Sequence, residues 1–179
     1  MNETGKMIHW STRSLALTAM FTAMNVALSS FGIPVPGGHF YLNDIVICLA
    51  AILLDPAEAF IVGGVGAFLG DLLFYPAPMF VSLVTHGLQA LVISFIVHSL
   101  PADAAISRRR AAAIVGVTIG AVIMVAGYTL GRAFIYSTPE YAVVKLPYQI
   151  LQAAAGAVLG VILAYGAGIE KLYRKYARV

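Results

Sequence analysis

The chain contains few charged side chains and a single cysteine, and both shortages limit what it can be. Only 11% of its 179 residues are Asp, Glu, Lys or Arg, whereas a soluble domain carries about 25%. Apolar residues make up 60% of the chain, and the mean hydropathy is +0.89. This composition excludes a water-soluble globule and predicts a polytopic membrane protein. Cys48 cannot form an internal disulfide, so cysteine usage says nothing about the redox compartment.

Long intervals without charged residues divide the chain into predicted membrane spans. Prolines and glycines at 32–38, 55–56, 75–78 and 101 separate these intervals. Because a span needs about 20 residues, we predict one all-α integral membrane domain over residues 1–179, a bundle of six transmembrane helices. Their expected ranges are about 13–31, 41–54, 57–74, 79–99, 110–134 and 141–172. The second is short, so an alternative treats the second and third as one broken pair.

The distribution of Lys and Arg predicts the orientation of these helices. With six crossings both termini lie on one side, which receives Lys6, Arg13, Arg108, Arg109, Arg110, Lys171, Arg174, Lys175 and Arg178. The other side receives Arg132 and Lys145. We therefore expect both termini to be cytoplasmic and the three consecutive arginines to contact anionic membrane lipid. The net charge of +3 then reflects topology, and no nucleic acid partner is expected.

Polar residues within the predicted spans collect in the outer half of the bilayer. Charged groups in hydrocarbon cost about 2.5–3.5 kcal/mol each, so they face the bundle interior or a wet cavity. Helical spacing also places His86 and Gln89 on one face. The pattern predicts an outward-facing substrate pocket formed by Asn25, Asp44, Asp71, His86, Gln89, Tyr128, Arg132, Lys145, Tyr148, Gln149 and Gln152.

The chemistry of this predicted pocket suits a small polar heterocycle. Two carboxylates, Asp44 and Asp71, nearly cancel the charges of Arg132 and Lys145, which disfavours a polyanion or a multivalent cation. Tyr rings can stack on a ring ligand, while His, Asn and Gln can bind ring nitrogens and hydroxyls.

Purely structural roles remain open for several of these residues. Asp44 and Lys145 could be solvated at the membrane interface, and Asp71 could pair with Arg132. An aromatic belt at the interface could account for the tyrosines, and Tyr136 fits that explanation best.

Small residues recur at helical spacing, most distinctly in the first predicted helix. Glycines in the third, fifth and sixth helices provide small-xxx-small faces for close helix contacts. In the first helix Ala19, Ala23 and Ala27 repeat every four residues, with Ala16 nearby. This face forms a smooth groove on which a helix of another protein could dock, and internal packing is the competing explanation.

Motifs that indicate catalysis are missing from the sequence. There is no Gly-rich phosphate loop followed by Lys and Ser or Thr, no His-Glu-x-x-His and no cysteine pair. We therefore expect no enzyme, no cofactor and no metal site. An alternative membrane enzyme would use Asp71 and His86 as an acid–base pair, but no nucleophile accompanies them.

Three stretches of the chain carry a family resemblance: His39–Val46, Leu54–Pro56 leading into Gly63–Leu73, and Lys145–Gln152. They resemble the substrate-binding S components of energy-coupling factor (ECF) vitamin transporters. The similarity is closest to the branch with riboflavin-type and hydroxymethylpyrimidine- or pyridoxine-type S components. The repeat of Ala19 and Ala23 is similar to the motif by which such components dock on the transmembrane coupling subunit.

The resemblance implies a vitamin-binding subunit of an ECF-type ABC importer in a prokaryotic plasma membrane. Its ligand would be pyridoxine- or hydroxymethylpyrimidine-like first and riboflavin next, covered by the loops 34–41, 75–78 and 135–141. Its partners would be the coupling subunit and two ATPase subunits. A stand-alone secondary transporter is the alternative, although neither inverted repeats nor a midplane ionisable group is evident.

Overall fold

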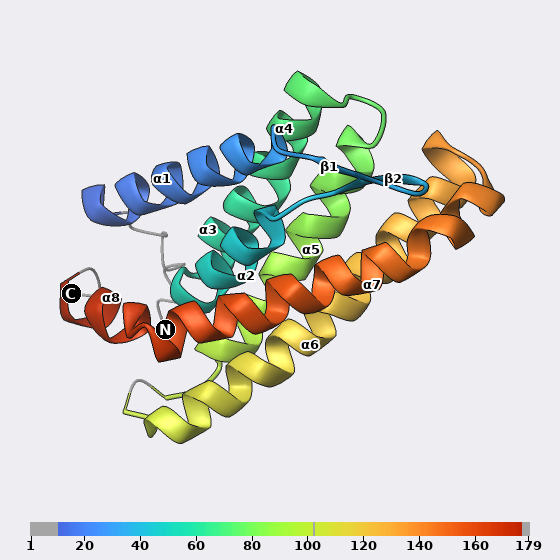
Figure 1. The fold of residues 1–179 in the computed structure, drawn as a ribbon. Coiled ribbons are helices and arrows are strands. Elements are labelled where there is room, and N and C mark those ends of the chain that lie inside the picture. The colour runs from blue at the N-terminus through green and yellow to red at the C-terminus, as the bar shows by residue number, and fades with distance from the viewer. Residues whose placement is uncertain (1–10, 102, 177–179) are drawn as a thin grey trace, which may run out of the picture.

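The computed structural model describes residues 11–101 and 103–176, which are almost entirely helical (Figure 1). A short antiparallel hairpin, β1 (Ile33–Val35) and β2 (Gly38–Phe40), is the exception. Three segments are π-helical and carry the labels η1 to η3. The helices, in chain order, are α1 (Thr12–Ser29), α2 (Asn43–Leu53), α3 (Pro56–Phe60), η1 (Ile61–Val65), α4 (Gly66–Phe74), α5 (Met79–His98), α6 (Ile106–Gly131), η2 (Arg132–Tyr136), α7 (Pro139–Val161), η3 (Ile162–Gly166) and α8 (Ile169–Tyr176).

Within the described residues, four helical stretches are long and apolar enough to cross a membrane: Pro56–Phe74, Met79–His98, Ile106–Tyr136 and Pro139–Gly166. The outer surface of the bundle is apolar as well, since Phe80, Phe95, Val122 and Phe134 are 64% to 78% exposed. Such a surface fits lipid and not water. The all-α class and the multi-pass membrane character are therefore confirmed. Six crossings stay a prediction, because α2 has only 11 residues and α1 is more polar.

Several predicted boundaries are corrected by the structure. The predicted helix 141–172 ends at Gly166, because Gly168 adopts a φ of +73° that breaks the helix before α8. The predicted helix 110–134 instead begins at Ile106 and continues to Tyr136. The predicted pocket cover at 34–41 contains the β hairpin, which was not expected.

The predicted second and third helices are separate elements. α2 ends at Leu53, and α3 begins at Pro56, which lacks a backbone N–H and is favoured at the first helical position. The Glu58 carboxylate accepts a hydrogen bond from the Asp55 backbone N–H at 3.3 Å. This contact caps the new helix at its start.

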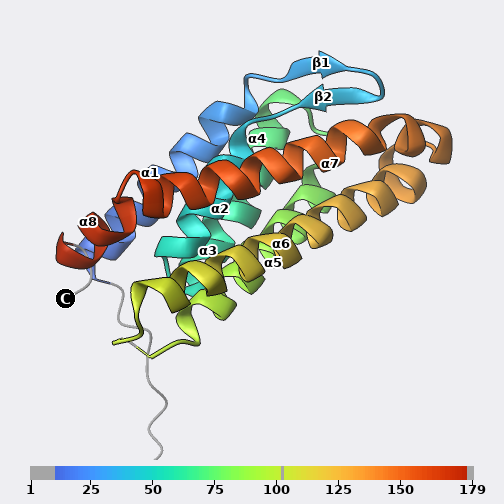
Figure 2. The same ribbon diagram turned by 60° about the horizontal axis from the view of Figure 1, so that its bottom comes forward.

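The bundle has two distinct ends (Figures 1 and 2). The terminal end contains residues 11–13, 99–101, 103–110 and 167–176, and Arg13 Nη1 donates to the Tyr176 carbonyl at 3.1 Å. At the hairpin end, residues 30–42 lie beside 75–78 and 136–138. Most described basic residues lie at the terminal end, as predicted, while Lys6 and Arg178 are outside the described residues. Which end faces the cytoplasm stays a prediction.

α2 runs through the centre of the bundle and forms most of its core. Every residue from Val46 to Leu54 is at most 5% exposed. α7 packs so closely on α2 that a Cβ atom added at Gly156 would lie 2.5 Å from the Asp44 Cβ. Glycine is therefore required at this contact, and α2 carries its first residues into the interior at the hairpin end.

Candidate ligand-binding site

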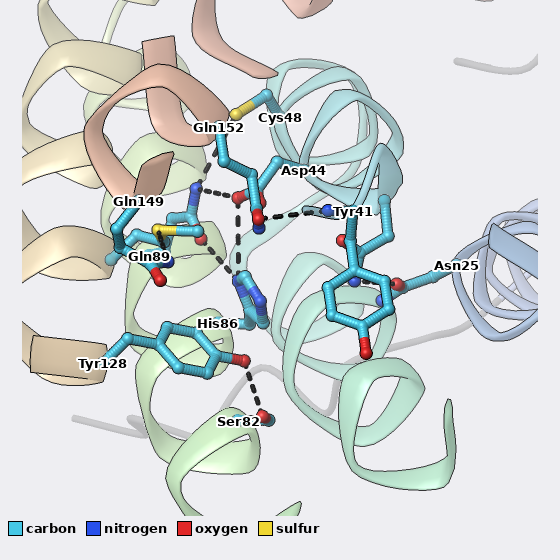
Figure 3. A network of polar contacts seen from close by, with 12 residues as sticks. Asn25, Tyr41, Asp44, Cys48, Ser82, His86, Gln89, Tyr128, Gln149 and Gln152 are labelled. Atoms are coloured by element: carbon cyan, nitrogen blue, oxygen red, sulfur yellow. Dashed lines mark hydrogen bonds and ion pairs between the residues drawn. The ribbon is translucent and has the colours of Figure 1, made fainter. Parts of the chain in front are cut away.

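Asp44, in the first turn of α2, organises a buried polar network (Figure 3). Its carboxylate is 1% exposed and accepts hydrogen bonds from Gln89 Nε2 at 3.1 Å and from Gln152 Nε2 at 2.7 Å. Gln152 Oε1 accepts in turn from the Tyr41 backbone N–H at 3.1 Å. Since a buried carboxylate needs such donors, Asp44 joins α2, α5, α7 and the chain leaving the hairpin.

His86 is oriented by the same network. The Gln89 amide donates to Asp44, so its oxygen faces His86 Nδ1, 2.7 Å away. In a neutral imidazole Nδ1 then carries the proton, which leaves Nε2 as a hydrogen-bond acceptor. The Tyr128 and His86 rings meet edge to face, with centroids 5.1 Å apart. The Asp44 carboxylate also lies 3.8 Å from Nδ1. In its neutral form His86 therefore presents one acceptor, Nε2, beside an aromatic ring.

A second group of polar side chains surrounds Asp71 near the end of α4. The Ser82 hydroxyl donates to the Asp71 carboxylate, and Ser82 Oγ lies 2.5 Å from the Tyr128 hydroxyl. These contacts join α4, α5 and α6. Asp71 is thus hydrogen-bonded to Ser82, whereas Arg132 donates to the Gly37 carbonyl at 2.8 Å. The pairing of Asp71 with Arg132, which the sequence left open, is not seen.

An asparagine pair connects α1 to the start of α2. Asn43 Nδ2 donates to Asn25 Oδ1 at 3.1 Å, and Asn25 Nδ2 donates to the Val62 carbonyl in η1 at 2.6 Å. Val62 belongs to a π-helical turn, a type of turn that recurs at functional sites. Asn43 Oδ1 is buried without a hydrogen-bond partner among the described residues, so it is available to a ligand donor.

Two cationic side chains hold the hairpin against the bundle. Lys145, 2% exposed, donates from Nζ to the His39 carbonyl at 2.7 Å, and Arg132 makes the contact with Gly37 described above. Gly37 has a φ of +79°, and a Cβ there would lie 2.9 Å from the Lys145 Cβ. The turn therefore requires glycine both for its backbone and for this close approach.

These side chains enclose a cavity at the hairpin end. The cavity is small, with a volume of about 40 Å³. The lining comes from the hairpin region, α2, α4, α5, α6 with η2, and α7. It consists of Ser29, Gly38, His39, Tyr41, Asn43, Ala67, Asp71, Tyr75, Pro78, His86, Tyr128, Arg132, Tyr136, Lys145, Gln149 and Gln152.

The structure brings most of the predicted substrate-binding residues to this cavity. Those that line it are Asp71, His86, Tyr128, Arg132, Lys145, Gln149 and Gln152. Asn25, Asp44 and Gln89 lie directly behind the lining, where they hold Asn43, Gln152 and His86. Tyr148 is half-buried and outside the lining. Their ligand roles stay predictions.

Other lining residues were missed by the sequence analysis as site residues. Tyr41 and Asn43 lie in the stretch His39–Val46, which also contains Asp44 and resembles the ECF S components. That resemblance could have identified both as site residues. Burial, followed by the nearby Asp71 carboxylate, raises the pKa of Tyr41 to about 12, so its phenol stays neutral at physiological pH. Tyr136 was assigned to the interface belt, yet it lines the cavity with a buried hydroxyl that has no partner among the described residues.

The alanine face of α1 points away from the bundle. Ala16, Ala19, Ala23 and Ala27 are exposed, while the opposite face of α1 is buried through Thr18, Phe21, Asn25 and Ser29. The last three alanines line a groove of about 570 Å³ whose far wall is Ile61 and Leu69. Internal packing therefore does not explain the alanine repeat.

An apolar helical bundle with a polar cavity at one end defines a multi-pass membrane protein suited to holding a small polar molecule. Residues 9–171 match the family model described as ECF-type riboflavin transporter, S component. The chain belongs to this family of vitamin transporter subunits, which confirms the resemblance seen in the sequence.

Two relatives were found among known proteins. The thiamine precursor transporter HmpT of Lactococcus lactis subsp. cremoris (strain MG1363) is 30% identical over 157 residues, 85% of this chain and 86% of the relative. An uncharacterised protein from Pyrococcus woesei is 30% identical over 145 residues, 80% of this chain and 93% of the relative. The family and HmpT names describe transporter components and not enzymes.

Proposed function

We propose that this S component captures a single-ring polar heterocycle of the thiamine-precursor kind, with hydroxymethylpyrimidine as the first candidate and pyridoxine as the second. The observation that carries the proposal is the small cavity lined by His86, Asn43 and tyrosines. The similarity to HmpT, a thiamine precursor transporter, supports it. Uptake would proceed from the outside of the cell, by docking on a coupling subunit with two ATPase subunits.

The unpaired groups of the cavity match such a ring. His86 Nε2 and Asn43 Oδ1 are acceptors suited to the amino and hydroxymethyl groups of a substituted pyrimidine. The Tyr136 hydroxyl can donate to a ring nitrogen, and the Tyr128 ring provides an aromatic surface. A space of about 40 Å³ requires less side-chain movement for one ring than for the three fused rings of a flavin.

The first test is ligand binding to the purified protein, measured by isothermal titration calorimetry with hydroxymethylpyrimidine, pyridoxine and riboflavin. We expect hydroxymethylpyrimidine to bind most tightly. His86→Ala removes the acceptor, and an unpaired ligand donor costs about 1–3 kcal/mol, so the affinity is expected to fall about 10- to 100-fold. His98→Ala, at the other end of α5, is the matched control and is expected to bind normally. Tighter binding of riboflavin, or equal affinities for the two variants, contradicts the proposal.

We propose that the hairpin covers the bound ligand and that the hydrogen bonds from Arg132 and Lys145 hold it closed. Arg132→Gln weakens the contact with the Gly37 carbonyl. A hydrogen bond from a charged group is worth about 1.5–3 kcal/mol, so ligand release is expected to be roughly 10-fold faster while association changes little. Stopped-flow measurement of both rates checks this. Arg110→Gln, at the opposite end of α6, should leave the rate of ligand release unchanged. An unaltered release rate for Arg132→Gln would show that Arg132 does not hold the hairpin closed.

A further inference from the structure

A second hollow lies at the terminal end, lined by residues from the first half of α1 and from α8, whose ribbons both lie at that end of the bundle (Figure 1). Its volume is about 430 Å³, and it opens outward between the two helices. Met20 and Leu172, two of its lining residues, are 48% and 58% exposed. Apolar side chains form nearly the whole wall: Leu17, Met20, Phe21, Leu53, Ile169, Leu172, Tyr173 and Tyr176.

Two exposed cations contact Tyr176, a residue of the cleft wall. Tyr176 lines the cleft, and its carbonyl accepts a hydrogen bond from Arg13 Nη1 at 3.1 Å. Lys175 Nζ lies 4.9 Å from the centroid of the Tyr176 ring. The acidic residue of α8, Glu170, is buried and lies 3.7 Å from Arg174. Among the described residues, the edge of the cleft at Tyr176 therefore carries two positive charges, while the cleft itself is apolar.

The cleft extends along α1 from the cationic residues at the end of the bundle to apolar residues further in. From Arg13 to Phe21 the α1 axis rises about 12 Å at 1.5 Å per residue, so the cleft runs from the cationic end of the bundle into its apolar zone. A phospholipid has its phosphate at one level of the membrane and its acyl chains below it. Basic side chains between helices at the membrane surface attract anionic lipid headgroups.

We propose that the cleft between α1 and α8 binds one anionic phospholipid of the surrounding membrane. The phosphate would lie between Arg13 and Lys175, and one acyl chain would occupy the apolar cleft along Leu17 and Phe21. The lipid would be bound on the side of α1 that leads to the alanine face. This site is at the opposite end of the bundle from the ligand cavity, and the inference is independent of the proposed vitamin.

The test is lipid retention after reconstitution in nanodiscs of equal parts phosphatidylglycerol and phosphatidylcholine, followed by native mass spectrometry. One phosphatidylglycerol is expected to stay bound, with at least a 10-fold preference over phosphatidylcholine. The double variant R13Q/K175Q is expected to lose that retention. The matched control R108Q/R110Q removes the same charge at the same end. Arg110 lies over the Tyr165 ring, which is outside the cleft lining, and contact of the arginine run with bulk lipid does not hold a single molecule, so retention of the one bound lipid should persist.

A variant of the cleft wall separates the lipid from a free anion. Met20→Trp keeps both cations and partly fills the cleft, so phosphatidylglycerol retention is expected to fall at least 10-fold. Thermal unfolding of each variant in detergent establishes that it is folded. Equal retention of the two lipids, equal losses in R13Q/K175Q and R108Q/R110Q, or binding of inorganic phosphate without lipid overturns the proposal. Cross-links that place the coupling subunit in the cleft, with no lipid retained, overturn it as well.

Discussion

Replacing Ala23 by tryptophan is expected to reduce uptake of labelled hydroxymethylpyrimidine at least 10-fold while the purified protein binds its ligand normally. Ala23 is exposed on the groove formed by α1 with Ile61 and Leu69. Helices pack in membranes through small residues that allow close backbone approach, so an indole ring would keep a partner helix away. The ligand cavity has no residue on this face. Uptake by cells that contain the coupling and ATPase subunits, beside calorimetry on the purified variant, separates docking from binding.

The control for this experiment is an equally bulky change elsewhere on the lipid-facing surface. Val122 is 65% exposed on α6, a helix that lies on the other side of the bundle from α1 (Figures 1 and 2). Val122→Trp should therefore transport normally. Normal uptake by Ala23→Trp would remove the alanine face as a docking site, and loss of uptake in both variants would show only that bulk on the surface is not tolerated.

The second large effect is expected from Asp44→Ala, which should abolish measurable ligand binding and lower stability by about 3 kcal/mol. The change leaves the amide donors of Gln89 and Gln152 unpaired in the interior, and each unpaired group costs about 1–3 kcal/mol. It also frees the side chains that orient His86 and the hairpin. Thermal unfolding in detergent and calorimetry measure the two consequences.

An aspartate at the opposite end provides the comparison. The Asp55 side chain is 70% exposed and lies 3.9 Å from His98, and surface ion pairs contribute little. Asp55 also caps the start of α3, and losing an Asp N-cap costs about 0.5–2 kcal/mol. Asp55→Ala is therefore expected to lower stability less than Asp44→Ala does and to leave binding intact. If Asp44→Ala unfolds at the wild-type temperature, Asp44 is not the organising group of the network.

Composition and helical spacing were sufficient to predict the membrane class and much of the candidate site. Lys145, Gln149 and Gln152 share one face of α7 and all reach the cavity, because their spacing follows the helical period. Tyr148 and Tyr136 could not be assigned in this way. Whether a tyrosine near a helix end faces lipid or cavity depends on helix rotation, which packing partners fix, and Tyr136 lies in the π-helical η2.

The hairpin and the helix break at Gly168 could not be predicted from the sequence either, because long-range contacts and backbone angles determine them. Proline and glycine at 32–38 signalled a turn, but the contacts that position it come from Arg132 and Lys145, about a hundred residues away in sequence. Gly168 is one of many glycines in the chain, and its positive φ distinguishes it only in the structure. Local patterns identify a turn, whereas long-range partners decide what it covers.

The π-helical turn at Ile61–Val65 has a consequence for sequence change within the family. A π turn holds more residues than an α turn, so removing one residue there would restore regular α geometry. Because the π turn already absorbs one extra residue, the helix after such a deletion would keep its rotation about the axis. The carboxylate that now meets Ser82 from α4 would therefore stay at the cavity. A relative can lose a single residue at η1 without exchanging the chemical groups offered to a ligand.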